Sequence, residues 1–285
     1  MTDPRFTTLI STEALGEALG RPDVVICDVR HDLMQPDLFG ETEYAKAHVP
    51  GAQFVHIDRD LSAPKTGKNG RHPLPTPETA AALFSRLGID ERKQVVAYDQ
   101  GNGMYAARLW WMLRWLGHDA AAVLDGGFAK WLREGRATTA EVPDPRPASF
   151  GIRHVTPTVN ATGVRASLGR NTLFLLDARA PERFRGDVEP IDPVAGHIPG
   201  AHNRPYTLNV DADGTFKAPA FLRAEFLALL DGASHETVVH SCGSGVTSCH
   251  NILAMEVAGF PGTRLYPGSW SEWSADPGRP IERGP

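Results

Sequence analysis

An internal repeat constrains the fold of this chain more than any other feature of its sequence. Four pairs of segments match in the same order along the chain: Val25–Arg30 with Phe174–Arg179, His48–Ala52 with His197–Ala201, Val95–Asp99 with Val238–Cys242, and Gly126–Trp131 with Gly268–Trp273. The offset between partners shortens by only a few residues along the chain, so the order is kept while loop lengths change. We therefore expect two copies of one structural unit in tandem.

Prolines mark the boundary between the two copies. The stretch Val142–Pro147 and the residues up to Pro157 contain several prolines, which hold the backbone extended and do not fit a helix interior. We predict an N-terminal domain over residues 1–140, a linker over 141–158 and a C-terminal domain over 159–285. Both domains then fall within the usual range of roughly 50 to 250 residues.

Short apolar runs rich in β-branched residues alternate with helical patterns in each copy. Strands are expected at Val24–Cys27, Val95–Tyr98, Leu173–Leu176 and Thr237–His240, and helices at Ala106–Leu116 and Cys249–Ala258. This alternation predicts the α/β class, with two domains that each hold a mostly parallel sheet flanked by helices. Asp99 and Cys242 then follow a strand and precede a helix, where open α/β sheets bind ligands.

Composition and charge argue against several functions. The formal net charge is −5 and the basic residues are scattered, which argues against nucleic-acid binding. No apolar run approaches the roughly 20 residues of a membrane span, and the N-terminus lacks a signal-peptide pattern, so we predict a cytoplasmic protein with no membrane partner. The 11 histidines lack the spacing of metal ligands, and we predict no metal and no organic cofactor.

The three cysteines are candidates for free thiols. Cys27, Cys242 and Cys249 are an odd number without Cys-x-x-Cys spacing, which argues against a disulfide framework and a zinc site. Cys27 lies in an expected strand and Cys249 in the expected helix, so we expect both in the core.

Cys242 opens a loop that suits anion chemistry. Gly243 and Gly245 let the backbone curl so that successive N–H groups, up to those of Val246 and Thr247, point inward. Such a nest, next to the positive end of a helix, lowers the pKa of a cysteine and stabilises a thiolate or a persulfide. We therefore predict that Cys242 is a nucleophile.

The segment Cys242–Thr247 resembles the active loop of the 3-mercaptopyruvate branch of the tandem rhodanese sulfurtransferases. The resemblance covers nearly the whole chain and includes the repeated segments described above. It implies two rhodanese-like domains with the active site at their interface, and sulfur carried as a persulfide on Cys242. It also implies a catalytically silent N-terminal domain, because Asp99 stands at the nucleophile position of the first copy. Taken by itself, Asp99 suits a solvated loop carboxylate or a helix N-cap.

The resemblance further suggests how a small anionic sulfur donor is bound. Arg183 stands at the position that contacts the donor, and Arg185 is a second candidate cation. Ser244 is placed to donate a hydrogen bond to the departing pyruvate oxygen. In the first copy, His72 resembles a histidine that reaches the active site, and Asp58 resembles its orienting partner.

The sequence leaves alternatives for both the sulfur donor and the sulfur acceptor. Gly243 and Ser244 favour 3-mercaptopyruvate, but the mercaptopyruvate enzymes use a second arginine where this chain has Ile191 or Asp192, which leaves thiosulfate open. The acceptor is cyanide, a thiol or a reductant of the thioredoxin type, and delivery of sulfur to a protein partner is a further alternative. A cysteine phosphatase is disfavoured, because Ser248 stands where Cys-x5-Arg requires arginine.

Overall fold

The computed structural model describes residues 5–170 and 172–285, and the chain forms two compact units. Unit 1 holds the described residues of Met1–Ser62, Pro75–Thr156 and Asp211–Phe216, and unit 2 holds those of Ala63–Leu74, Pro157–Val210 and Lys217–Pro285. The segment Ala63–Leu74 therefore belongs to unit 2, although it lies in the first half of the sequence.

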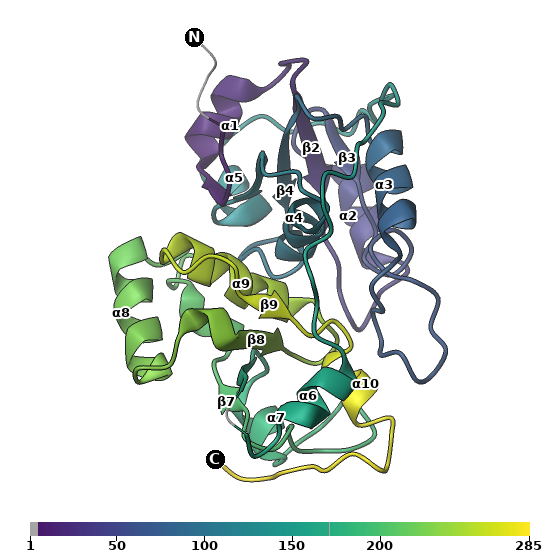
Figure 1. Cartoon of the computed structure of the whole chain (residues 1–285). Helices are drawn as coiled ribbons and strands as arrows, with labels where there is room; N and C mark the ends of the chain where they lie inside the picture. The colour runs from purple at the N-terminus through teal and green to yellow at the C-terminus, as the bar shows by residue number, and fades with distance from the viewer. Residues whose placement is uncertain (1–4, 171) are drawn as a thin grey trace. The chain divides into compact units, whose positions relative to one another are not determined.

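Unit 1 contains a parallel sheet in the order β1-β5-β4-β2-β3 (Figure 1). Its strands are β1 (Leu9–Ile10), β2 (Val24–Asp28), β3 (Ala52–Phe54), β4 (Gln94–Tyr98) and β5 (Ala121–Leu124). Its helices are α1 (Thr12–Ala18), α2 (Phe39–Lys46), α3 (Pro77–Arg86), α4 (Ala106–Trp115) and α5 (Gly127–Arg133). Strands buried on both faces read as continuous apolar runs, and β2, β4 and β5 do so.

Unit 2 contains a parallel sheet in the order β7-β6-β8-β9. Its strands are β6 (Phe174–Asp177), β7 (His202–Asn203), β8 (Val238–Ser241) and β9 (Arg264–Leu265). Its helices are α6 (Ala161–Ser167), α7 (Pro181–Arg185), α8 (Pro219–Leu230), α9 (Thr247–Val257) and α10 (Ser269–Trp273), with 3-10 turns η1 (Tyr206–Asn209) and η2 (His235–Thr237).

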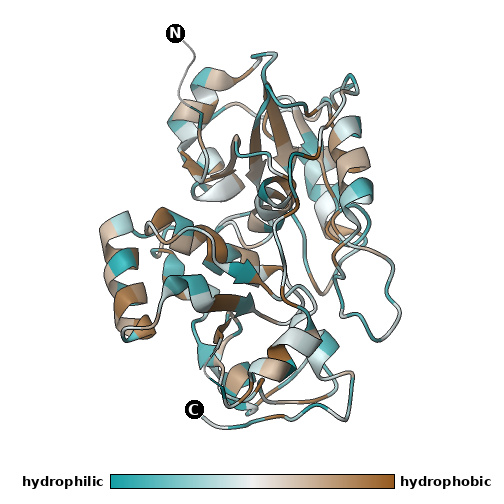
Figure 2. Cartoon of the chain, viewed as in Figure 1, coloured by the Kyte–Doolittle hydropathy of each residue, from teal (hydrophilic) through white to brown (hydrophobic). Residues whose placement is uncertain are grey.

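The sequence repeat is a repeat of structure. The order β5-β4-β2-β3 in unit 1 corresponds to β9-β8-β6-β7 in unit 2, so β4 and β8 are equivalent interior strands. Both strands are buried over most or all of their length, as the middle of a sheet requires, and the sheet strands of unit 1 are largely brown in Figure 2. The predicted fold class, two tandem α/β domains with mostly parallel sheets flanked by helices, is confirmed.

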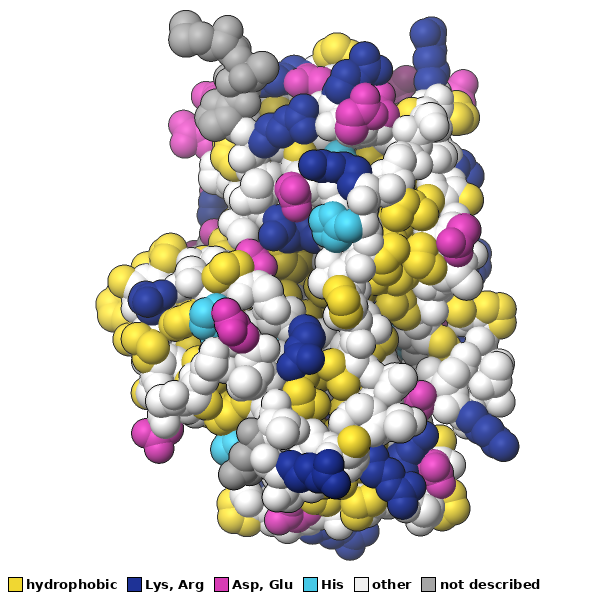
Figure 3. All heavy atoms as spheres, in the orientation of Figure 1, with side chains coloured by type: hydrophobic (Ala, Val, Ile, Leu, Met, Phe, Trp, Pro, Cys, Tyr) yellow, Lys and Arg dark blue, Asp and Glu magenta, His cyan; other side chains and the backbone are white. Residues whose placement is uncertain are grey.

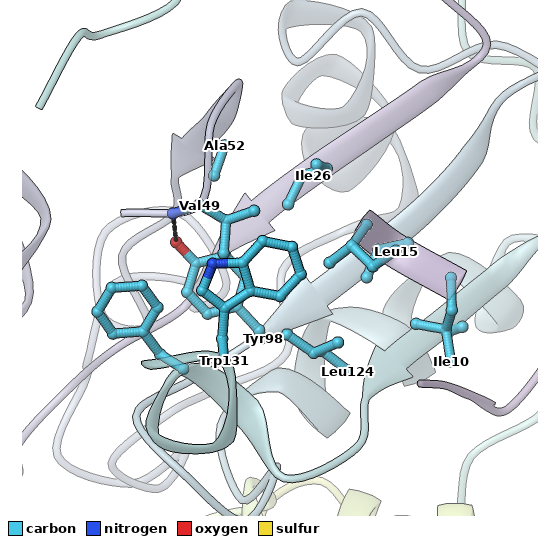
Figure 4. Close-up of a cluster of buried hydrophobic side chains, with 11 residues drawn as sticks. Ile10, Leu15, Ile26, Val49, Ala52, Tyr98, Leu124 and Trp131 are labelled. Atoms are coloured by element: carbon cyan, nitrogen blue, oxygen red, sulfur yellow. Dashed lines mark hydrogen bonds between the residues drawn. The ribbon is translucent and has the colours of Figure 1, made fainter. Parts of the chain in front are cut away.

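Each unit has its own hydrophobic core. In unit 1, Ile26, Tyr98 and Trp131 pack together with residues from β1, α1 and β5 (Figure 4). The Tyr98 hydroxyl accepts a hydrogen bond from the Val49 N–H at 3.2 Å, which ties the apolar cluster to the turn that precedes β3. In unit 2, the corresponding cluster combines residues of α6, β6, β8 and α10, among them Val164, Val239 and Trp270.

The repeated Asp-x-Arg motif is structural in both units. The Arg30 guanidinium donates to the Asp28 carboxylate and to the carbonyl of Ala47, and both side chains are buried. Arg179 makes the same two contacts, with Asp177 and with the carbonyl of Gly196. The motif therefore fastens the carboxyl end of a central strand to the turn before the next strand. Because each charge is paired and hydrogen-bonded, its burial is tolerated.

The molecular surface mixes charges of both signs. On the face drawn in Figure 3, lysine and arginine side chains are interspersed with aspartate and glutamate. Of the helices in residues 5–170 and 172–285, none combines the length and the apolar character that a membrane crossing requires.

Candidate active site

The candidate site begins at the carboxyl end of β8, the interior strand of unit 2. β8 ends at Ser241 and α9 begins at Thr247, so the loop from Cys242 to Val246 joins the sheet directly to the helix. The predicted helix at Cys249–Ala258 starts two residues earlier than expected, which brings its first N–H groups close to the loop. The sulfur of Cys242 therefore lies at the end of the sheet where ligands bind in open α/β folds.

The turn at the start of α10 orients the loop. The N–H groups of Trp270 and Ser271 donate to the carbonyl oxygens of Cys242 and Gly243, each at 2.9 Å. The Ser269 hydroxyl accepts the Cys242 N–H at 3.0 Å. Because these contacts hold the two carbonyl groups against α10, the following N–H groups are free to face the sulfur.

Gly245 allows the loop to close. Its φ of +81° lies in the left-handed region, and a Cβ added there would lie 2.3 Å from the carbonyl oxygen of Pro267. Only glycine satisfies both restrictions without movement of the backbone. The Gly245 N–H consequently points at Cys242.

Cys242 is a buried thiol surrounded by hydrogen-bond donors. Its Sγ accepts the N–H of Ser244 at 3.4 Å and that of Gly245 at 3.1 Å, and it lies 3.6 Å from the Ser248 hydroxyl. Burial by itself raises the pKa of Cys242, but the Thr247 hydroxyl, the Ser244 N–H and both donors of Ser248 together lower that pKa below its ordinary value. The loop thus stabilises negative charge on sulfur, as a nucleophilic thiolate or a persulfide requires.

The other two cysteines have different surroundings. Cys27 lies in β2, and burial raises its pKa to about 12. Cys249 is buried in α9, and its thiol contacts the carbonyl of Gly245 at 3.4 Å. Both lie in the core as predicted, and the pKa of Cys242 is lowered whereas that of Cys27 is raised.

His72 and Ser244 form a buried pair beside the loop. His72 Nδ1 lies 2.7 Å from the Ser244 hydroxyl, and both side chains are almost inaccessible to solvent. His72 belongs to the segment Ala63–Leu74, which is part of unit 2, so the contact lies within a single compact unit. Ser244 follows Cys242 by two residues, so this contact brings the His72 imidazole to the loop that carries the sulfur.

Two guanidinium groups lie against the residue that follows Cys242. A Cβ built on Gly243 would lie 2.7 Å from Arg71 Nη2 and 3.7 Å from Arg183 Nη2. Arg183 also donates to Glu189 at 2.7 Å and to Asp192 at 3.3 Å, and Arg71 is paired with Asp192. Arg183 is thus beside the loop where the sequence resemblance places a donor-binding residue.

The sequence interpretation missed Arg71 as a site residue. It directly precedes His72, and a basic residue next to a candidate site histidine is the only local signal that could have suggested it. The side chains of the two acids that hold the guanidiniums, Glu189 and Asp192, are each only 3% exposed. Burial outweighs the arginines and raises the pKa of Asp192, whereas hydrogen bonds to Arg183 and to backbone N–H groups overcome burial and lower the pKa of Glu189.

Arg185 and Asp58 were also predicted as site residues. Arg185 ends α7 and forms a surface ion pair with Asp187 at 2.8 Å, and among the described residues it has no hydrogen bond to the Cys242 loop. Asp58 belongs to unit 1, where its carboxylate lies 3.9 Å from His31 Nε2. Its proposed pairing with His72 stays a prediction.

Asp99 is the residue of unit 1 that corresponds to Cys242. The expectation that Asp99 is a solvated loop carboxylate was wrong, because Asp99 is 0% exposed. One carboxylate oxygen accepts the N–H groups of Gly101 and Gly103, and the other accepts those of Tyr105 and Ala106 at the start of α4. The loop of unit 1 is therefore also an amide cradle, and the carboxylate of its own first residue occupies it.

Comparisons with known proteins agree with the sequence repeat. A family model for the rhodanese-like domain matches residues 11–134 and residues 160–276. A Pseudomonas aeruginosa protein named "Probable 3-mercaptopyruvate sulfurtransferase" is 47% identical over 279 residues, which are 97% of this chain and 98% of that protein. The thiosulfate sulfurtransferase of Cricetulus griseus is 37% identical over 85% of this chain and 83% of its own length. The solved structure of the 3-mercaptopyruvate sulfurtransferase from Leishmania major superposes with a TM-score of 0.83 at 31% identity, covering 94% of this chain and 74% of that one.

Proposed function

We propose that this chain, which belongs to the rhodanese family and is a sulfurtransferase, takes sulfur from 3-mercaptopyruvate onto Cys242 and passes it to a thiol or to cyanide. The observation that carries the proposal is the convergence of the Ser244 and Gly245 N–H groups on Cys242 Sγ, together with the lowered pKa of that thiol. A nucleophile and a cradle for its sulfur product then share one loop.

In the first half-reaction, the Cys242 thiolate attacks the sulfur of the donor. An S–S bond forms, the C–S bond of the donor breaks, and its electron pair passes to the carbon skeleton as the enolate of pyruvate. One proton converts that enolate to pyruvate, and Cys242 is left as a persulfide. The N–H groups that face the thiolate in the resting protein stabilise the persulfide anion in turn.

Ser244 and His72 suit the delivery of that proton. Their side chains lie 2.7 Å apart, so a proton given to the enolate by the Ser244 hydroxyl can be replaced from the imidazole. A hydroxyl two residues from the nucleophile can also donate a hydrogen bond to the developing enolate oxygen. This assignment predicts a histidine that cycles between protonation states during turnover.

In the second half-reaction, the acceptor attacks the outer sulfur of the persulfide. The S–S bond breaks, the Cys242 thiolate is regenerated, and cyanide leaves as thiocyanate or a thiol leaves as its persulfide. A dithiol reductant of the thioredoxin type would complete the cycle by releasing sulfide. Cys27, Cys242 and Cys249 form no disulfide bond in the described part of the chain, which suits a reducing compartment such as the cytoplasm.

Thiosulfate is the second candidate donor. Ile191 and Asp192 stand where the resemblance to mercaptopyruvate enzymes leads us to expect a further arginine, and relatives with both kinds of name match the chain. In favour of mercaptopyruvate, Gly243 and Ser244 add no cation of their own for a dianion, and thiosulfate cleavage needs no proton from the His72–Ser244 pair. Transfer of the persulfide sulfur to a protein partner would use the same first half-reaction.

The test is intact mass combined with turnover. The protein is incubated with 3-mercaptopyruvate or with thiosulfate, its mass is measured, and transfer to cyanide is followed for each donor. We expect a sulfur adduct and faster turnover with 3-mercaptopyruvate. Cys242→Ser should lose both the adduct and turnover, while Cys27→Ala should keep both.

The outcomes separate the alternatives. Turnover by Cys242→Ser, or wild-type protein without an adduct from either donor, would exclude the persulfide mechanism. Faster turnover with thiosulfate would identify it as the donor. An adduct without transfer to any small acceptor would favour delivery to a protein partner.

A further inference from the structure

We propose that Arg71 binds the carboxylate of the sulfur donor together with Arg183, and so helps to select a carboxylate-bearing donor. The inference rests on the proposed function, because it concerns the donor of the same half-reaction. Its basis is the placement of Arg71 and the use of its hydrogen-bond donors.

The backbone around Arg71 is fixed to the active loop on both sides. The Arg71 N–H donates to the Ser271 hydroxyl at 3.0 Å, and Ser271 in turn donates its own N–H to the carbonyl of Gly243. The next residue, His72, contacts Ser244. Arg71 is therefore held between two connections to the Cys242 loop, which limits the positions that its side chain can adopt.

The guanidinium groups of Arg71 and Arg183 both lie close to the position that a Cβ on Gly243 would take. The position of a Cβ on Gly243 is 2.7 Å from Arg71 Nη2 and 3.8 Å from Arg183 Nη1. Gly243 follows Cys242 directly, so a donor whose sulfur meets Cys242 has its far end within reach of these edges. The absence of a side chain at Gly243 leaves space for the Arg71 guanidinium beside that of Arg183.

Much of the hydrogen-bonding capacity of these arginines is unused within the protein. Arg71 donates through Nη1 to Asp192, whereas its buried Nε and its Nη2 have no acceptor among the described residues. Arg183 uses Nε and Nη2 for Glu189 and Asp192, and within the same described part of the chain its Nη1 has no acceptor. A buried N–H without an acceptor is costly, and an oxyanion at this point would satisfy it.

Asp192 holds the two guanidiniums in place. One of its oxygens is paired with Arg71, and the other accepts from Arg183 Nη2 at 3.3 Å. Because the acid is only 3% exposed, it is a fixed anchor rather than a surface counterion. The Arg71 side chain is 24% exposed and can be reached from solvent. Two guanidinium groups oriented in this way suit a planar carboxylate, which can accept hydrogen bonds from both.

The alternative is a purely structural role in which Arg71 serves only to neutralise Asp192. Both roles predict that Arg71→Gln impairs the protein, so activity alone does not separate them. They differ in their dependence on the donor. A donor-binding arginine affects only donors that carry the anionic group, whereas a structural arginine affects all donors alike.

The experiment compares 3-mercaptopyruvate with 1-mercapto-2-propanone, in which a methyl group replaces the carboxylate. Initial rates of sulfur transfer to 2-mercaptoethanol are measured for the wild-type protein, Arg71→Gln, Arg71→Lys and the control Arg165→Gln, which removes an equal charge from an exposed position on α6. Intact mass after reaction with each donor reports persulfide formation independently of the acceptor. Circular dichroism verifies that the variants are folded.

We expect Arg71→Gln to raise KM for 3-mercaptopyruvate by about tenfold or more, the loss typical of one charge-assisted hydrogen bond, with a smaller change in kcat. The KM of Arg71→Lys for 3-mercaptopyruvate should lie between those of the wild type and Arg71→Gln. Lysine keeps the positive charge but cannot donate two parallel hydrogen bonds as a guanidinium does. With 1-mercapto-2-propanone, the wild-type protein and Arg71→Gln should have the same kcat/KM, and Arg165→Gln should match the wild type throughout.

Equal losses with both donors, or an unchanged KM for 3-mercaptopyruvate in Arg71→Gln, would overturn the assignment of Arg71. A wild-type protein that gains no sulfur from either donor would instead refute the proposed function. The two failures are therefore distinguishable in one data set.

Discussion

Replacing Gly245 with alanine tests whether the shape of the loop governs the chemistry of Cys242. The residue has a φ of +81°, and an added Cβ would lie 2.3 Å from the Pro267 carbonyl oxygen. Gly262 is a matched control, since its φ is +80° and a Cβ there meets nothing within 4 Å. Alanine at either position incurs about 1–2 kcal/mol for the left-handed conformation. Only Gly245→Ala adds overpacking, which typically costs a further ~1–3 kcal/mol.

The two variants are compared by urea unfolding and by the pH dependence of alkylation at Cys242. Gly245→Ala should unfold at a lower urea concentration than Gly262→Ala. It should also raise the pKa of Cys242, because the backbone must move and the Gly245 N–H contact of 3.1 Å lengthens. Gly262→Ala should leave that pKa unchanged. Equal unfolding midpoints together with equal alkylation profiles would refute the argument that this glycine shapes the cradle.

Two further predictions concern titration. Thr247→Val removes a hydroxyl that lowers the pKa of Cys242, so alkylation of Cys242 by iodoacetamide at neutral pH should become slower. The control Thr162→Val, at an exposed position, should leave the alkylation rate unchanged. An unchanged rate in Thr247→Val would show that the backbone N–H groups are sufficient to lower the pKa. His240 is buried in β8, and burial lowers its pKa from 6.5 to about 3. At pH values between these two, the folded protein therefore binds fewer protons at His240 than the unfolded chain does. The stability that neutral His240 contributes is complete above pH 6.5 and is lost as the pH falls toward 3. The urea midpoint of His240→Gln should therefore fall less than that of the wild type between pH 7.5 and pH 5, and parallel decreases would contradict this account.

The features that could be predicted from the sequence are those that depend on local pattern. The repeat and its alternation of strands and helices determine the fold class, because buried parallel strands and their helices have distinct periodicities. The Cys242 loop was identifiable because two glycines between a strand and a helix have few other uses. Cys27 lies in a continuous apolar run, and its burial followed from that run.

The features that could not be predicted depend on contacts between distant segments. The Ser269 and Trp270 contacts with Cys242 join a loop to a turn far along the chain. Arg71 could not be assigned either, because the segment Ala63–Leu74 packs with unit 2 rather than with its neighbours in sequence. For Asp99, composition alone does not distinguish a carboxylate in water from one that is enclosed by four N–H groups of its own loop.

The enclosed carboxylate of Asp99 explains how the loop of unit 1 keeps its shape without a bound anion. Several buried N–H groups would have no acceptor if this loop enclosed nothing, and such a loop would be destabilised. Asp99 supplies carboxyl oxygens as acceptors from within the loop, so the N–H groups are satisfied without a substrate or a redox cycle. The strand-to-helix geometry between β4 and α4 is therefore maintained by contacts within the loop itself.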